Sequence, residues 1–174
     1  MVDRGSAEAA GPRTTIELEG DRGFVIRRRF NGPARIVFDA WTNPELVRRW
    51  WAPAALGVKF VSCDADVRVG GTYRYVIDNG QGQVMAFAGT YRELTPFTRL
   101  VHTQFFEPTA SGANPDDEPL IVTVTFDERD GRTDVVSRAV APTPEIRDAI
   151  IASGMEHGVH ATWDQLDDLI ATMR

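Results

Sequence analysis

Six segments between residues 58 and 140 alternate apolar and polar side chains with a period of two. Such alternation is typical of β-strands whose two faces meet different surroundings. The segments are 58–69, 72–78, 83–94, 99–107, 119–128 and 133–140, and 24–30 precedes them as a seventh strand. Turn sequences such as DNGQG separate them, so the spacing predicts sequential antiparallel hairpins.

Two short helices are predicted directly after the first strand, over the stretches ARIVFDAWT and NPELVRRWW. Asn43 suits the N-cap of the second one, and Pro44 suits its first helical position. Residues 143–174 are predicted as one long helix with Thr143 as its N-cap. Gly154 and Gly158 each weaken that helix by about 1 kcal/mol relative to alanine.

The order of elements is therefore strand, two short helices, six strands and a long helix. From Met155 onward the apolar side chains of the long helix recur three and four residues apart, which gives it one apolar face. An antiparallel sheet and such a helix bury their apolar faces together when the sheet curls round the helix. The sequence thus predicts an α+β domain over 21–174, and the polar residues 1–20 are predicted to be a disordered tail. Side chains often fail to fill so curved a sheet, which leaves an internal cavity.

The amino-acid composition argues against several classes of function. Lys and Arg number 19 against 25 Asp and Glu, a net charge of −6, which argues against electrostatic binding of nucleic acid. Cys63, the single cysteine, lies in a predicted strand and is expected to be a buried, inert thiol rather than a nucleophile. The N-terminus lacks the apolar core of a signal peptide, and no apolar run is long enough to span a membrane. The expectation is a soluble protein of the reducing cytoplasm.

Several stretches in order resemble one known family. NPELVRRWWAP after the short helices, DVRVGGTYRY, GTYRELTPFTRLVHT and the closing SGMEHGVHATWDQLDDLI are similar to the activator-of-Hsp90-ATPase-homologue-like branch of the START/polyketide cyclase (SRPBCC) superfamily. The likeness runs from Phe24 to the C-terminus. It implies a helix-grip (START or Bet v 1-like) fold with a pocket between the last helix and the concave face of the sheet. Arg28 stands where that family commonly has an arginine, whereas Gln104 stands where an aromatic residue is expected.

The resemblance and the strand pattern together indicate a set of ligand-binding residues, and no metal, cofactor or catalytic residue is predicted. The candidate ligand-binding residues are Arg28, Trp41, Trp51, Phe60, Tyr73, Tyr75, Phe87, His102, Gln104, Phe106, Met155, Val159, Trp163 and Leu166.

Polar residues within this set have alternative interpretations. His102 is either a polar group facing the pocket or a hydrogen-bonded histidine of the sheet, because both faces of its strand are apolar. Arg28 either holds a ligand carboxylate or forms an ion pair with Asp64 or Asp66. The Gly70-Gly71 pair favours a tight turn over a phosphate loop, because a strand rather than a helix follows it.

Two histidines of the last helix suggest a metal site at first sight. On a helical projection His157 lies almost opposite the apolar face, and His160, Asp164 and Asp167 fall on the polar side. A metal needs three or four converging ligands. We therefore interpret both histidines as solvated, and a weak surface metal site is the alternative.

Three functions fit the sequence. The first is non-catalytic binding of a small hydrophobic or lipid-like molecule in the internal cavity. The second is a cyclase- or dehydratase-type enzyme in which His102, Arg28 or a tyrosine moves a proton in the same pocket. The third is a co-chaperone-like domain that acts on an Hsp90-type ATPase. The sequence leaves a homodimer and a protein partner open.

Overall fold

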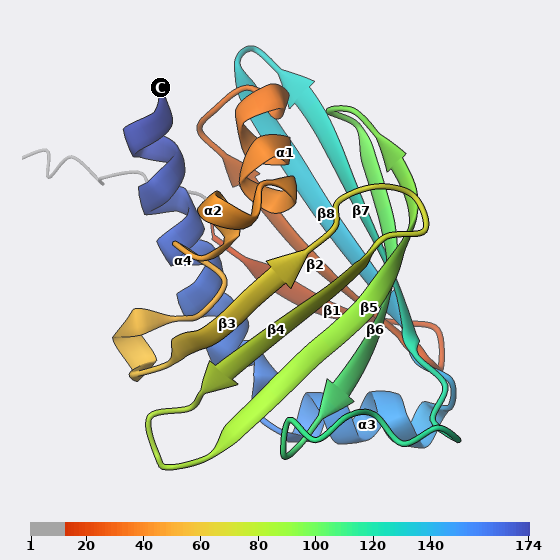
Figure 1. The fold of residues 1–174 in the computed structure, drawn as a ribbon. Coiled ribbons are helices and arrows are strands. Elements are labelled where there is room, and N and C mark those ends of the chain that lie inside the picture. The colour runs from red at the N-terminus through yellow and green to blue at the C-terminus, as the bar shows by residue number, and fades with distance from the viewer. Residues whose placement is uncertain (1–12) are drawn as a thin grey trace, which may run out of the picture.

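The computed structural model describes residues 13–174. Its largest element is one eight-stranded sheet in the order β1-β2-β8-β7-β6-β5-β4-β3, with every neighbouring pair antiparallel. The strands are β1 (Thr15–Glu19), β2 (Gly23–Phe30), β3 (Lys59–Ala65), β4 (Thr72–Asp78), β5 (Val84–Thr95), β6 (Arg99–Glu107), β7 (Leu120–Arg129) and β8 (Arg132–Val140). Figure 1 shows the sheet strongly curved, with helices lying across its open side.

Strands β3 to β8 follow one another as hairpins, as the turn sequences predict. The single long crossover runs from β2 to β3 and contains the short helices α1 (Ala34–Thr42) and α2 (Pro44–Val47) and the 3₁₀ turn η1 (Ala54–Leu56). The Asn43 side chain accepts a hydrogen bond from the Glu45 amide at 3.1 Å, so the predicted cap of α2 is confirmed. The sheet stays open, and its two edges are β1 and β3.

The N-terminal prediction needs a correction. Thr15–Glu19 form strand β1, paired with β2 across a turn at Gly20, rather than part of a disordered tail. Four of its five side chains are exposed and only Ile16 is half-buried. The strand is thus formed by backbone pairing with the edge of β2 and has little hydrophobic signal in the sequence. Residues 1–12 of the predicted tail lie outside the described residues.

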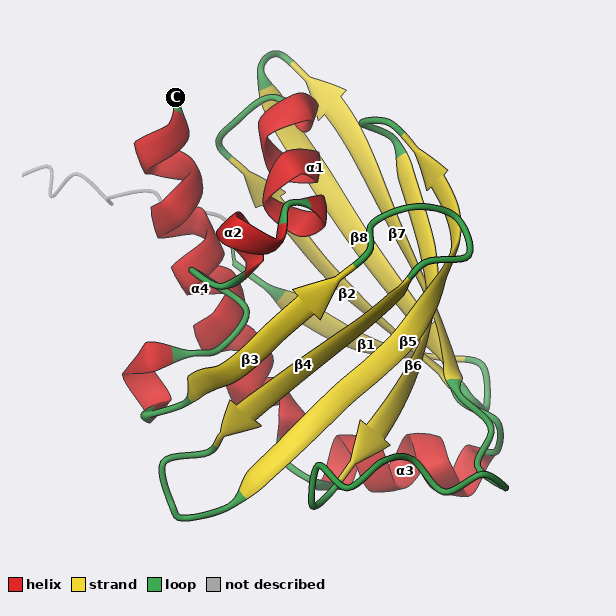
Figure 2. Ribbon diagram, in the orientation of Figure 1, coloured by secondary structure: helices red, strands yellow, loops and turns green. Residues whose placement is uncertain are grey.

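The C-terminal region is two helices instead of the single one predicted. They are α3 (Pro144–Ala152) and α4 (Met155–Met173), separated at Gly154, whose φ is +81°. The Thr143 side chain caps α3 by accepting from the Ile146 amide at 3.2 Å, as predicted. A left-handed residue cannot continue an α-helix, so Gly154 changes the direction of the chain rather than merely weakening a helix. In Figure 2, α3 and α4 are seen as separate helices.

A dense aromatic cluster, here called the filled core, packs α1 and the C-terminal half of α4 against β2 and β7. Trp163 stands edge-on to Trp41 at 5.5 Å between ring centroids, and Phe30 lies 5.7 Å from Trp163. Gly32 allows α4 to approach closely, since a Cβ there would lie 2.8 Å from Ile170. Residues of this core with less than a tenth of their surface exposed include Phe30, Phe38, Trp50, Phe126, Trp163, Leu166 and Ile170.

Candidate ligand site

A second aromatic group covers the concave face of β3, β4, β5 and β6. We call it the aromatic wall, and it consists of Trp51, Phe60, Tyr73, Tyr75, Phe87, Tyr91 and Phe106. Trp51 reaches it from the chain after α2, with ring centroids 5.1 Å from Tyr75 and 5.0 Å from Phe87. Phe106 continues it on β6, 5.2 Å from Phe87. In Figure 1, α4 runs behind β3 and β4.

The register of the strands explains why these rings share one face. Tyr75 lies opposite Phe87, and Phe87 lies opposite Phe106, so three neighbouring strands each contribute one ring to the same row. Tyr73 lies opposite Gly89, where a Cβ would come within 1.9 Å of the Thr103 carbonyl oxygen and 2.8 Å of the Tyr73 ring. The missing side chain at this position lets the Tyr73 ring cross β5 and donate to the Thr103 carbonyl at 2.8 Å.

His102 faces inward, next to this wall. Its strand partner is Val122, which belongs to the buried core, and its ring stands edge-on to Tyr73 at 5.2 Å. The His102 Nδ1 atom lies 2.9 Å from the Thr103 carbonyl oxygen and 3.1 Å from the Tyr73 hydroxyl. A carbonyl oxygen can only accept, so Nδ1 carries the proton of the neutral ring. Burial lowers the pKa of His102, which keeps the ring neutral and leaves Nε2 as an acceptor.

Arg28 on β2 and His102 beside the wall each leave one nitrogen without a hydrogen-bond partner among the described residues. Within residues 13–174, Arg28 Nε is the one side-chain nitrogen or oxygen that is both sealed from solvent and without a hydrogen bond. His102 Nε2 has no hydrogen-bond partner among these residues either, so it must retain accessible surface. Burial raises the pKa of Tyr73, Tyr75 and Tyr91, so all three phenols remain protonated at neutral pH.

The inward-facing side chains divide into a sealed part and a partly accessible part. Trp163 and Leu166 of α4 are sealed in the filled core, at 5% and 0% exposure. Met155 and Val159, in the N-terminal half of the same helix, are only half-buried. Half-buried side chains of the opposite sheet face are Phe60, Phe87, His102 and Gln104, together with Trp51; Phe106 is exposed. The interior is therefore filled at one end, and side chains at the other end keep accessible surface.

Arg28 is an ion-pair residue, but its partners differ from the predicted Asp64 or Asp66. Its Nη1 lies 2.5 Å from Asp164 and its Nη2 lies 3.1 Å from Asp167, both on α4. Nη1 also donates to the Thr14 hydroxyl at 3.2 Å. The polar side of α4 is thus partly turned toward β2, and both terminal nitrogens of the guanidinium pair with carboxylates of the protein itself.

The remaining predicted site residues fall into two groups. Trp41 packs within the filled core, 4.7 Å from Trp50 between centroids. Gln104 lies beside the wall, with Oε1 3.5 Å from the Tyr73 hydroxyl. Sequence reasoning left out Tyr91, although it shares a face with Phe87 by the same period of two. It also left out the Thr103 carbonyl, which no side-chain pattern reveals.

The two histidines of α4 lie away from the wall. His157 is exposed, and His160 lies 3.6 Å from Glu156 on the same helix. Across the part of the chain that the structure describes, no three histidine, cysteine or acidic side chains are grouped so as to hold a metal ion. In the same residues, no helix is long and apolar enough to cross a membrane. Cys63 is buried, as predicted, and burial raises the pKa of its thiol to about 11.

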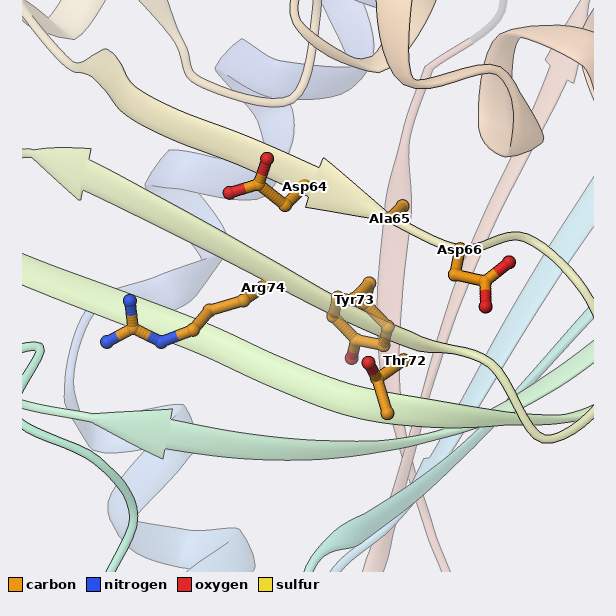
Figure 3. A pocket seen from close by; sticks show the side chains of 6 residues that line it. All are labelled: Asp64, Ala65, Asp66, Thr72, Tyr73 and Arg74. Atoms are coloured by element: carbon orange, nitrogen blue, oxygen red, sulfur yellow. The ribbon is translucent and has the colours of Figure 1, made fainter.

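A surface depression of about 350 Å³ lies on β3 and β4, lined by Asp64, Ala65, Asp66, Thr72, Tyr73 and Arg74 (Figure 3). Its charged groups are largely engaged elsewhere: Arg74 pairs with Glu107 at 2.6 Å and Asp66 pairs with Arg68 at 2.7 Å. The aromatic wall combines apolar surface with a neighbouring polar atom that is free to bind, His102 Nε2, which is the composition of ligand sites. We therefore regard the wall, rather than this depression, as the candidate site.

Comparison with known proteins agrees with this fold. Solved structures from Rhodobacter sphaeroides (23% identity, TM-score 0.79, 93% of this chain and 100% of that chain) and Mycobacterium smegmatis (19%, 0.80, 90% and 96%) share it. A structure from Staphylococcus epidermidis is 26% identical, with a TM-score of 0.74 over 92% of this chain and 95% of that one. No curated protein sequence matches the chain. The family model described as Activator of Hsp90 ATPase homolog 1-like protein matches residues 31–171. The chain belongs to this family.

Proposed function

We propose that the protein binds a small hydrophobic molecule between the aromatic wall and the N-terminal half of α4. The observation that carries the proposal is the accessible surface kept by inward-facing apolar side chains, namely Trp51, Phe87, Met155 and Val159. Inward-facing apolar side chains of a protein are normally packed as densely as molecules in an organic crystal, as they are in the filled core of this fold. Covering them with a ligand would remove apolar surface from water, at roughly 25 cal/mol per Å².

A thermal-shift panel of lipids, aromatic compounds and polyketide-like compounds tests this proposal. A ligand at about 100 times its dissociation constant stabilises the native state by about 2.7 kcal/mol. For a chain of this size that corresponds to a rise in Tm of about 5–10 °C. Native mass spectrometry of the same mixtures would give the stoichiometry.

Matched variants locate the site. Val159→Trp places a large ring in the proposed space and is expected to abolish the shift, whereas Val61→Trp on the exposed surface of β3 is expected to preserve it. Val61 is 61% exposed, so its replacement leaves the interior unchanged. The proposal fails if no compound raises Tm, or if Val159→Trp responds as the wild type does.

Acid–base catalysis in the same space is a second candidate, favoured by the inward position of His102. A neutral imidazole held through Nδ1 by a carbonyl can take a proton at Nε2. If this candidate holds, His102→Gln would lose turnover of a bound compound and retain its binding. Equal turnover by the variant and the wild type would exclude this role.

A further inference from the structure

The side chains at the wall select one kind of polar group on a ligand. They present a free acceptor, His102 Nε2, because Nδ1 is committed to the Thr103 carbonyl. An apolar ligand that covered Nε2 would strip it of water without replacing the hydrogen bond. Leaving a buried acceptor unsatisfied in this way is more costly than the average hydrogen bond is favourable.

The phenols supply the complementary donor. Burial raises the pKa of Tyr75 and Tyr91, so both hydroxyls keep the proton that they can donate. Within residues 13–174 neither hydroxyl has a hydrogen-bond partner, and neither is sealed from solvent. Their protons are therefore left for another acceptor. The Tyr91 ring lies 6.3 Å from that of His102 between centroids, so donor and acceptor face neighbouring parts of the wall.

The charges around the wall argue against an ionic group on the ligand. The wall and His102 include no carboxylate that could receive an ammonium group. Arg28, the cation that the sequence predicted for the ligand site, is held by Asp164 and Asp167. An ether or ketone oxygen can accept from a phenol but cannot satisfy Nε2. A hydroxyl group is neutral and both donates and accepts, so it satisfies both sides.

We infer that the ligand is a hydroxylated ring compound whose hydroxyl group donates a hydrogen bond to His102 Nε2, while its ring packs on the aromatic wall. This inference rests on the proposed function and specifies the class of ligand. His102 is then a residue that determines specificity, through one hydrogen bond that an otherwise identical ether cannot form.

The test compares 2-naphthol with 2-methoxynaphthalene, which has the same ring system but no hydroxyl proton. Titration calorimetry at neutral pH is expected to show that the wild-type protein prefers the naphthol by about 3–10-fold, the range of one net hydrogen bond. His102→Phe should remove the preference. His157→Phe, the same substitution at an exposed histidine, should retain it.

Nitrogen NMR of the wild type gives a second measurement that does not depend on how well the variant folds. On addition of 2-naphthol the His102 Nε2 resonance should move and the Nδ1 resonance should stay, while His157 and His160 serve as internal references. Equal affinity for the two probes, or an unmoved Nε2, overturns the inference and leaves the proposed function standing. Failure of both probes to bind also overturns it, and the proposed function is then decided by the compound panel alone.

Discussion

Replacing Asp164 and Asp167 together with asparagine should destabilise the fold more than replacing Arg28 with methionine. The Arg28 side chain is only 6% exposed, whereas those of Asp164 and Asp167 are 69% and 33% exposed. Removing the carboxylates leaves a buried charge without counter-charge. Removing the guanidinium leaves two carboxylates that water can reach.

The magnitudes follow from this asymmetry. Stranding a fully buried charge costs about 3–5 kcal/mol, and because these carboxylates are partly hydrated we expect about 2–4 kcal/mol for the double aspartate variant. Arg28→Met is expected to stay within about 1 kcal/mol of the wild type, because it also removes the sealed Nε atom that has no partner, a defect worth about 1–3 kcal/mol. Methionine retains most of the packing volume beside Phe30.

Urea unfolding followed by tryptophan fluorescence measures these differences as shifts in midpoint at constant m-value. The triple variant, which combines Arg28→Met with the two aspartate replacements, should recover most of the stability lost in the double aspartate variant, because it no longer holds a buried charge. An Arg28→Met variant as unstable as the double aspartate variant would refute the reasoning, since it would mean that the ion pair itself is strongly net stabilising.

Three further outcomes are expected. In urea titrations Gly89→Ala should lower the free energy of unfolding by about 1–3 kcal/mol or more, because its Cβ meets the Thr103 carbonyl. Gly158→Ala has open space and should raise the free energy of unfolding by about 0.5–1 kcal/mol, and equal effects of the two variants would contradict this. The Cys63 thiol, with its pKa of about 11, should react with a disulfide reagent at about pH 8 only when urea unfolds the chain, and rapid labelling of the native protein would contradict its burial. The pKa of His102 is lowered in the folded state from its usual 6.5, so as the pH drops below 6.5 the unfolded state binds a proton at His102 that the folded state does not. The free energy of unfolding of the wild type should therefore fall in this range. His102→Phe should flatten that fall between about pH 7.5 and about pH 5.5, and an unchanged slope would assign the pH dependence to other groups.

Local patterns in the sequence predicted most of the fold. Strands β2 to β8 show the period of two because one face of each meets the core, and the caps at Asn43 and Thr143 are local signals that the structure confirms. The family resemblance is confirmed as well. Strand β1 escaped because its polar side chains pair through the backbone, and the break at Gly154 escaped because a glycine in a helical pattern does not reveal its own φ.

The candidate site was harder to predict because its parts meet across long stretches of chain. Arg28 pairs with Asp164, 136 residues away, and no spacing rule relates the two. The inward face of β6 was ambiguous because both of its faces are apolar, so only the pairing of His102 with Val122 decides it. Likewise, Trp163 and Met155 share the apolar face of α4, yet Trp163 is buried and Met155 is only half-buried. The difference depends on which side chains pack opposite each residue, and the helical pattern does not reveal these.

The open edges of the sheet have a consequence for the handling of this protein at high concentration. An unpaired strand is a template on which another molecule can add its own strand. Strand β1 is only five residues long and carries Glu17 and Glu19, while β3 carries Lys59 and has an irregular register between Phe60 and Ser62. Short length, charge and a bulge each obstruct such addition. The sheet can therefore stay open at both ends and still resist growth into fibrils through its edges.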